Sequence, residues 1–420
     1  MTTFPRVQAI ILSVAVVILA FPGILRAQSF LLISPAPDGN GWGNISTAVP
    51  SDNPIAVAVN PGQLGFFSLS SIFAASSYTP KTDWLPSFQG DVTYNAWGLS
   101  AGYNVGKLLA LPFSLSAGIG YSRIDLDLGT FVRTGSGGPD PIGTFHAFEN
   151  TMNVSVGIGV EYFVRLGLGW NFKDVYSTLG VIYGDPAISS EANFSTSDFG
   201  VILQAPFGSL ITCWSDSSSS GIQPLIDLTL GYSIANRGDE SVMYPGSSEQ
   251  NPLPRFGIGG MSLEIGITKE VLGTRWKILT FTIAREADDL LVTYYPDGTF
   301  EYQDGLGDIS FLTNVIGGKA DADGVNSRKG WQLNLAEFVM VRHGSYSELP
   351  EQGNRNYSTS GYSLHLAGLV KLVEALAPGS TSGGITSFVR DHIDIAFDHA
   401  YYSGGTLDGT SFDALTLAFR

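Results

Sequence analysis

TMNVSVGIGVEYF, residues 151–163, alternates between two kinds of side chain from one position to the next. Because side chains of a β-strand point alternately to its two faces, this stretch predicts a strand with one apolar face and one small, polar face. The apolar positions are Val154, Val156, Ile158, Val160 and Tyr162, and the others are Asn153, Ser155, Gly157, Gly159 and Glu161. The fold depends on whether the apolar face packs on a protein core or faces lipid.

The composition is unusual for a soluble protein. Charged residues make up 14% of the 420 residues, against roughly 25% in soluble domains, whereas aromatic residues reach 12%. The net charge of −16 argues against binding of nucleic acid, which needs a basic surface. We therefore expect no nucleic-acid partner. Cys213 is the one cysteine of the sequence, so no internal disulfide can form.

The N-terminus has the parts of a secretory signal peptide. Arg6 and the amino group supply positive charge, residues 9–20 (AIILSVAVVILA) form a short apolar core, and a plausible cleavage point follows Ala27. We expect residues 1–27 to be removed on export, and an uncleaved anchor is the alternative. After residue 27 no run approaches the roughly 18 apolar residues of a spanning helix, so a mature membrane protein would cross with strands.

The same alternation recurs along the rest of the chain and predicts about 14 strands. Many of them have about 9 to 11 residues, the length that a tilted strand needs to cross the hydrocarbon layer. The expected strands are 66–77, 97–105, 113–121, 151–163, 163–173, 196–204, 225–234, 257–268, 277–285, 308–316, 331–343, 361–371, 391–401 and 411–419.

Three of these strands carry special features. Residues 308–316 are weakly patterned. In 331–343, Glu337 falls on the apolar parity, and we interpret this as a β-bulge that shifts the phase. In 277–285, Lys277 and Arg285 share the apolar face and could snorkel to the two membrane interfaces.

The second face of the strands indicates which side meets water. It consists mostly of Gly, Ser, Thr and Asn with few charges, which suits a barrel lumen better than bulk water. Aromatic residues cap many apolar faces, as in the girdles of outer-membrane barrels. We therefore predict an all-β fold, a closed antiparallel transmembrane β-barrel over residues 66–420, in the cell outer membrane. A soluble exported β-sandwich is the alternative.

Residues 28–65 precede the expected barrel. Residues 34–54 are rich in Gly, Asn, Asp and Pro, and residues 55–65 (IAVAVNPGQLG) are apolar up to Asn60-Pro61. We interpret 28–65 as a plug or periplasmic segment, with a short helical stretch inside or across one mouth of the barrel. An ordinary N-terminal strand is the alternative.

Polar residues on the expected lumen faces are candidate binding groups. His392, Asp394 and Asp398 share one face of 391–401, and a histidine beside paired acids could perform general acid–base chemistry. Polar lining of a lumen is the simpler interpretation. The full set of lumen or binding candidates is Asn60, Pro61, Glu264, His365, Lys371, His392, Asp394 and Asp398.

Two motifs raise the possibility of other chemistry. His343-Gly344-Ser345 has the spacing of outer-membrane phospholipase A, with a base and a nucleophile on one strand face. Asp321-x-Asp323-Gly324 resembles half a calcium loop, but Lys319 occupies a place where another ligand would help. Phosphate-binding, dinucleotide-binding and zinc motifs are absent from the sequence. We expect no metal, no cofactor and no enzymatic activity, with a surface hydrolase barrel as the alternative.

Several short motifs resemble those of the PorV/PorQ branch of the FadL-like outer-membrane barrels. Residues 60–64, Asn-Pro-Gly-Gln-Leu, are similar to that group's Asn-Pro-Ala-Gly-Leu segment, from which Gly62 and Gln63 depart. Residues 78–86 (YTPKTDWLP) resemble its following Tyr-x-x-Trp-Leu element. Further similar segments are 253–255, 335–346, 359–362 and 393–401.

The resemblance implies a 14-stranded barrel with an N-terminal segment in or near the lumen. FadL proteins pass hydrophobic molecules, and PorV is a shuttle of the type IX secretion system that carries exported cargo to a sortase at the cell surface. We accordingly expect a role in protein secretion, with outer-membrane lipid and a secreted cargo protein or surface sortase as partners. Passage of hydrophobic small molecules is the alternative.

Overall fold

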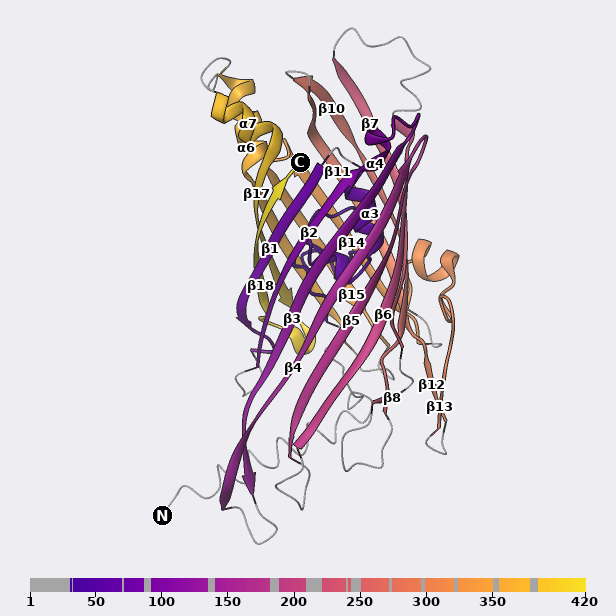
Figure 1. Ribbon diagram of the computed structural model, residues 1–420, viewed down its shortest axis with the longest axis vertical. Helices are drawn as coiled ribbons and strands as arrows, with labels where there is room; N and C mark the ends of the chain where they lie inside the picture. The colour runs from indigo at the N-terminus through magenta and orange to yellow at the C-terminus, as the bar shows by residue number, and fades with distance from the viewer. Residues whose placement is uncertain are drawn as a thin grey trace.

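The chain forms a closed barrel in a computed structural model (Figure 1). The structure describes residues 31, 33–69, 72–86, 92–134, 140–181, 189–208, 221–238, 241–242, 251–271, 274–295, 299–320, 324–349, 355–377 and 384–420. The expected signal peptide, residues 1–27, lies outside these ranges. Within them, 14 antiparallel strands follow one another around the barrel in chain order, and β1 closes the ring against β18.

The barrel strands are β1 (Ile72–Asp83), β2 (Thr93–Asn104), β3 (Ser114–Thr134), β4 (Pro141–Glu161), β5 (Arg165–Val181), β6 (Ser189–Pro206), β7 (Ile222–Gly238), β10 (Phe256–Val271), β11 (Thr274–Leu290), β14 (Asn326–Leu335), β15 (Val339–Ser347), β16 (Tyr357–His365), β17 (Ile393–Ser403) and β18 (Ser411–Phe419). Two small hairpins are separate from this sheet, β8 (Ser241–Val242) with β9 (Asn251–Pro252), and β12 (Val292–Tyr294) with β13 (Phe300–Tyr302).

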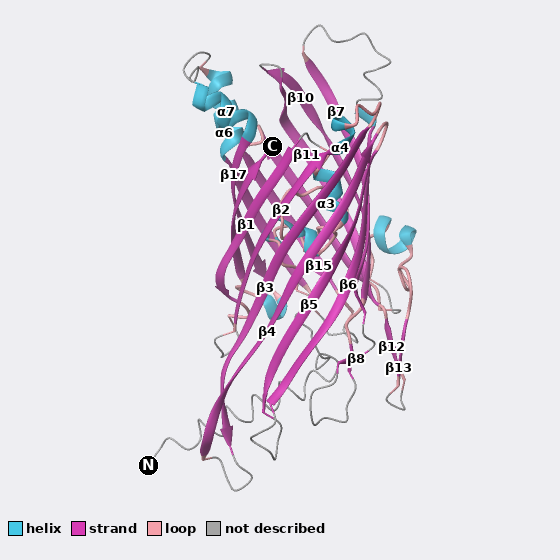
Figure 2. Cartoon of the chain, viewed as in Figure 1, coloured by secondary structure: helices cyan, strands magenta, loops and turns pink. Residues whose placement is uncertain are grey.

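Helices are short and few (Figure 2). They are α2 (Pro37–Asn40), η2 (Ala56–Ala58), α3 (Gly62–Phe67), α4 (Val105–Leu108), η3 (Phe311–Ile316), α6 (Leu366–Leu376), α7 (Gly384–His392) and η5 (Gly405–Leu407). None of the helices in the described ranges has the length and apolar character that a membrane-spanning helix requires.

The predicted fold, a closed antiparallel barrel of 14 strands with a short helical N-terminal segment, is confirmed. Two errors in the strand prediction offset each other. Residues 308–316 contain the helix η3, whereas 331–343 contain two strands, β14 and β15. Ala336 and Glu337 have φ values of 56° and 53°, and the Phe338 N–H donates to Leu335 O at 3.0 Å. Because positive φ at both central residues suits a tight hairpin, Glu337 marks a turn and not a bulge.

Three other boundaries or orientations differ from expectation. The first strand begins at Ile72, because residues 62–67 are helical. The strand expected over 361–371 ends at His365, where α6 begins. A register shift beside Thr268 turns Lys277 into the lumen, where it pairs with Glu264 at 2.8 Å, so Lys277 is not at an outer interface.

The two ends of the barrel differ. The C-terminal end carries Arg420, α4, α6 and α7, while the opposite end, here called the loop end, carries the hairpins β8–β9 and β12–β13 (Figure 1). β3 and β4 have 21 residues each and extend far beyond the wall at the loop end. At about 3.3 Å per residue such a strand is roughly 70 Å long, more than twice the hydrocarbon thickness of about 30 Å.

The apolar face of the strands is the outer face. In β4, Val154, Val156 and Ile158 are 45%, 40% and 46% exposed, whereas Asn153 and Ser155 are buried in the barrel interior. The orientation on which the sequence argument depends is therefore the observed one.

Residues 33–69 cross the barrel interior and are here called the plug (Figure 1). At the loop end, Ile55 and Ala56 of the plug join an apolar cluster of inward-facing strand residues. In that cluster the rings of Tyr94 and Phe412 meet edge to face, with centroids 5.4 Å apart. The plug then reaches the C-terminal end, where β1 starts at Ile72.

Candidate functional site

Glycines on the inner wall allow the plug backbone to approach closely. A Cβ on Gly159 would overlap the carbonyl oxygen of Gly65, and one on Gly169 would overlap that of Pro61. A Cβ on Gly200 would overlap the side chain of Asn60. The small face of β4, β5 and β6 is therefore a docking surface for α3, and this explains the glycine-rich parity of residues 151–163.

Asn60, a predicted site residue, is fully buried at the centre of this contact. Its Nδ2 donates to Thr47 O at 2.8 Å and to Val201 O at 3.0 Å, while its Oδ1 accepts the Gly62 N–H at 2.9 Å. One side chain thus ties two parts of the plug to β6. Pro61 follows it directly before α3, where a fixed φ suits the start of a helix.

The two departures from the family-like motif also serve the plug. Gly62 lies against the Gly167 carbonyl of β5. Gln63 is fully buried, and its Nε2 donates to Ser46 O at 3.2 Å and to Val49 O at 2.7 Å. Both residues therefore have a packing role in this chain.

The side chain of Glu286 in β11 binds the backbone of the plug. Its fully buried carboxylate accepts the N–H groups of Ser46, Thr47 and Ala48 at 3.4, 2.6 and 2.8 Å. Arg328 lies 4.0 Å away as a counter-charge. Hydrogen bonds to a charged acceptor are the strong kind, so this carboxylate is a main anchor of the plug.

A second anchor surrounds Asn44, whose φ of 64° marks a sharp bend in the plug. Arg328 donates to Asn44 O at 2.9 Å and pairs with Asp288 at the same distance. The Tyr402 hydroxyl donates to Asn44 Oδ1 at 2.5 Å, and Asn44 Nδ2 donates to the Tyr357 hydroxyl at 2.6 Å. Three wall strands therefore hold one plug residue.

On the C-terminal side of the plug, the lumen contains a cavity of about 420 Å³. Its wall is rich in ion pairs. Glu264 pairs with Lys277 at 2.8 Å, and Arg342 pairs with Asp398 at 3.2 Å. Asp227, Arg165 and Arg275 also line it. This charged lining suits water or polar ligands and not an apolar solute.

Asp38 of the plug faces the same cavity. Its carboxylate accepts hydrogen bonds from the Ser51 hydroxyl and from Asn53 Nδ2, the latter at 3.1 Å. Burial raises the pKa of Asp38, and the nearby Asp398 raises it further, while Arg342 acts in the opposite direction. The plug thus carries an acid that burial holds toward its neutral form.

The structure brings four of the predicted residues to this part of the lumen. Glu264, His365 and Asp398 line the cavity, and Asp394 pairs with His365 at 2.7 Å. The His365–Asp394 pair is joined by the Ala367 N–H, which donates to Asp394 at 3.1 Å.

Two predicted residues lie elsewhere. His392 ends α7 and is exposed at the rim, where its ring stacks on Phe419, so it does not share the lumen with Asp394 and Asp398. The expected grouping was wrong because residues 391–392 are helical. Lys371 belongs to α6 and pairs with Glu337 at 2.6 Å.

Sequence reasoning missed Glu286, Arg328 and Arg342. Glu286 continues the inward parity of Thr282 and Ala284, but the strand was expected to end at Arg285. A longer expected strand would have included it. Arg328 likewise precedes the expected start at residue 331.

Among the residues that it describes, the structure does not assemble a catalytic or metal site around the two motifs that could indicate other chemistry, His343-Gly344-Ser345 and Asp321-x-Asp323-Gly324. His343 is exposed on the outer wall, and its Nδ1 lies 3.1 Å from Ser360 Oγ, not against Ser345. Within the described ranges no carboxylate forms an ion pair with His343, although a catalytic base is normally oriented by a third group. The described residues contain no group of three or more His, Cys, Asp or Glu placed to hold a metal ion. Asp321 and Asp323 lie outside them.

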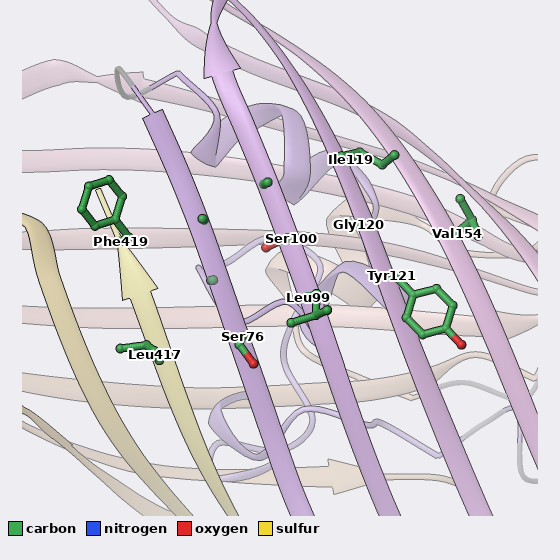
Figure 3. A pocket seen from close by; sticks show the side chains of 12 residues that line it. Ser76, Leu99, Ser100, Ile119, Gly120, Tyr121, Val154, Leu417 and Phe419 are labelled. Atoms are coloured by element: carbon green, nitrogen blue, oxygen red, sulfur yellow. The ribbon is translucent and has the colours of Figure 1, made fainter.

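Another hollow, of about 640 Å³, is on the outer wall over β18, β1, β2 and β3 (Figure 3). Its lining combines small side chains, at Ala74, Ser76 and Ala101, with larger apolar ones such as Leu99 and Phe419. Most of the larger side chains around it are exposed on the apolar exterior, so the hollow is a furrow of the outer wall.

No family model matches the sequence, and no curated protein matches it. Solved structures similar to this chain include the Pseudomonas putida toluene transporter TodX, with 11% identity over 91% of this chain and 96% of that chain and a TM-score of 0.37. A Pseudomonas aeruginosa FadL homologue has 9% identity over 92% and 97%, with a TM-score of 0.35. The translocator domain of the autotransporter NalP from Neisseria meningitidis has 11% identity over 83% and 87%, with a TM-score of 0.36.

Proposed function

We propose that this protein is an outer-membrane barrel that is closed by its own plug and that docks exported protein at its loop end. The role agrees with the secretion function implied by the PorV-like motifs. The observation that carries it is the hairpin of β3 and β4, which extends beyond the wall with apolar side chains uncovered.

The described part of this hairpin beyond the wall exposes apolar side chains on both faces. Phe131 and Val132 are 44% and 59% exposed, and Ile142 on the facing strand is 60% exposed. Phe131 stacks on Phe145 with a centroid distance of 5.4 Å. Successive residues of a strand face opposite sides, so exposure of both Phe131 and Val132 means that neither side is covered. Uncovered apolar patches in water mark sites for protein partners.

The plug supports the same proposal. Glu286, Asn60 and the wall glycines hold it along its length, and the cavity beside it is lined by ion pairs. A barrel with such a lumen offers its loops, rather than a passage, as the functional surface.

A photo-crosslinking residue at Val132 or Ile142 tests the proposal in intact cells, with the exposed Glu301 of the separate β12–β13 hairpin as the control position. We expect one defined adduct with an exported protein at 132 and 142. The double substitution Val132→Asp and Ile142→Asp should abolish surface display of that protein while the barrel still assembles. Unchanged display in the double variant, or adducts only of the kind seen at Glu301, would contradict the proposal.

Passage of hydrophobic small molecules is the second candidate. A hollow of about 50 Å³ is lined by Leu31, by Ile33 of the plug, and by the wall residues Ile124 and Ile258. It is too small for a hydrocarbon solute, so passage would require the plug to move. Uptake of a monoaromatic hydrocarbon that rises when Glu286 is replaced by Ala would favour this role over docking.

A further inference from the structure

We infer that α6, with α7, forms part of the lipid-facing surface and inserts an apolar stripe into the membrane leaflet at the C-terminal end of the barrel. The inference rests on the membrane location proposed above. It concerns the outer surface at the rim (Figure 1), where both helices continue beyond the end of β17.

The outer face of β16 is too short to cross the apolar layer. Its outward residues are Ser358, Ser360, Tyr362 and Leu364, so only the last two are apolar. They span about 7 Å of strand, against the roughly 25 Å of an outer-membrane barrel's apolar band. By contrast, β4 presents apolar outward residues from Met152 to Val160. Something other than β16 must complete the band on this side.

Helix α6 follows β16 directly and supplies the missing surface. Leu366, Val373 and Leu376 are 36%, 41% and 78% exposed, and with Leu369 and Val370 they follow the helical spacing of a single stripe. A helix of 11 residues is about 16 Å long. Added to the apolar end of β16, this length approaches the height of the band.

The other side of α6 is fixed to the protein, so the stripe must face outward. Lys371 pairs with Glu337 at 2.6 Å, and a Cβ on Gly368 would overlap the Glu337 carbonyl. Glu374 pairs with Arg390 of α7 at 2.8 Å. Two ion pairs thus attach α6 to the turn between β14 and β15 and to α7.

Helix α7 connects this stripe with the exterior of the barrel. Phe388 is exposed, and its ring lies 6.4 Å from that of Phe419. Phe419 in turn borders the outer furrow shown in Figure 3. Aromatic contacts therefore connect the outer face of β18 with α7, and the outward apolar residue Leu364 of β16 leads directly into the stripe of α6. This continuity identifies lipid as the occupant.

Site-specific fluorescence in lipid vesicles tests the inference with the full chain. In a Cys213→Ser background, single cysteines at Val373 and Leu376 carry an environment-sensitive dye, and the vesicles contain brominated lipid as quencher. Ala375, on the opposite side of α6, is the matched control, and Leu364 of β16 reports the lipid-facing wall. We expect the dye at 373 and 376 to be quenched as strongly as at 364, and the dye at 375 to be spared.

Two results would overturn the inference while leaving the membrane location intact. In one, 364 is quenched by lipid but 373 and 376 behave like 375. In the other, 373 and 376 are shielded from both brominated lipid and aqueous iodide, which would show that a second copy of the chain covers the stripe. Absence of quenching at 364 as well would refute the membrane location together with the inference.

Discussion

The carboxylate of Glu286 in β11 accepts the backbone N–H of Thr47 in the plug at 2.6 Å, across 239 residues of sequence. The same carboxylate accepts the Ser46 and Ala48 amides, so three donors depend on one side chain. This arrangement makes Glu286 the natural point at which to loosen the plug without disturbing the outer wall.

Replacing Glu286 by Ala should release the middle of the plug. The change leaves buried amides without acceptors and is expected to cost about 3–5 kcal/mol. Hydrogen exchange of residues 44–50 should show the loss of protection, and Glu286→Gln, which keeps one acceptor oxygen, should lose less. The control is Glu264→Ala, whose carboxylate pairs with Lys277 on the wall. Equal exchange in Glu286→Ala and the control would show that the carboxylate does not anchor the plug.

The glycine surface makes a second prediction. Gly159→Ala adds a Cβ that overlaps the Gly65 carbonyl, so α3 can no longer seat fully on β4. Overpacking of this kind costs about 1–3 kcal/mol. Protease sensitivity of residues 60–69 measures the effect. Gly143→Ala on the same strand is the matched control, because its Cβ would meet nothing within 4 Å. If both variants resist proteolysis like the wild type, the close approach is not needed for docking.

The plug should bind more tightly at low pH through Asp38. Its pKa in the folded protein is raised above the ordinary value of 3.8, chiefly by burial. A raised folded-state pKa stabilises the fold fully below the unfolded-state pKa, and this contribution is lost as the pH rises through the folded-state pKa. Asp38→Asn, which stays neutral, should remove that dependence.

Hydrogen exchange of residues 37–53 in the wild type, compared with Asp38→Asn at each pH, measures this effect. The comparison at equal pH cancels the intrinsic pH dependence of exchange. Protection in the wild type should approach that of the variant at low pH and fall below it as the pH rises. A constant difference across the titration would show that Asp38 does not titrate in the plug.

The alternation of apolar and small residues was sufficient to predict most of the barrel strands. It did not predict a hairpin turn within one expected strand or the helix that ends another. The alternation around Ile158 predicted a strand and its outward face correctly, because period-two burial is a property of neighbouring residues. The hairpin turn at Ala336 and Glu337 was missed since neither residue is a usual choice for positive φ. Tyr362, Leu364 and Leu366 continue the strand alternation into α6, so pattern alone could not show where the strand ends.

The plug contacts could not be predicted, for a different reason. The residues around Thr47 and Glu286 do not indicate that the two will meet. The glycines of β4 and β5 are equally compatible with a strand face that lines a water-filled lumen. The sequence indicates Asn60 as a candidate binding residue, but its partner Val201 lies 141 residues away. Such contacts follow from closure of the barrel and not from spacing along the chain.

The orientation of the wall can be tested with two adjacent residues of β7. Leu230 points outward and is exposed, whereas Thr229 points inward and lines the lumen cavity. An arginine at 230 would face the apolar layer and should cost roughly 2–4 kcal/mol near the midplane, while an arginine at 229 can extend into the cavity toward Asp227 and Glu264 and should cost less. Denaturant unfolding of the protein refolded in lipid vesicles measures both. Ser155 would be a poorer inward control, because its stretch of β4 lies under α3. If the two arginines destabilise the barrel equally, the apolar face does not meet lipid, and docking at the loop end of a membrane barrel loses its basis.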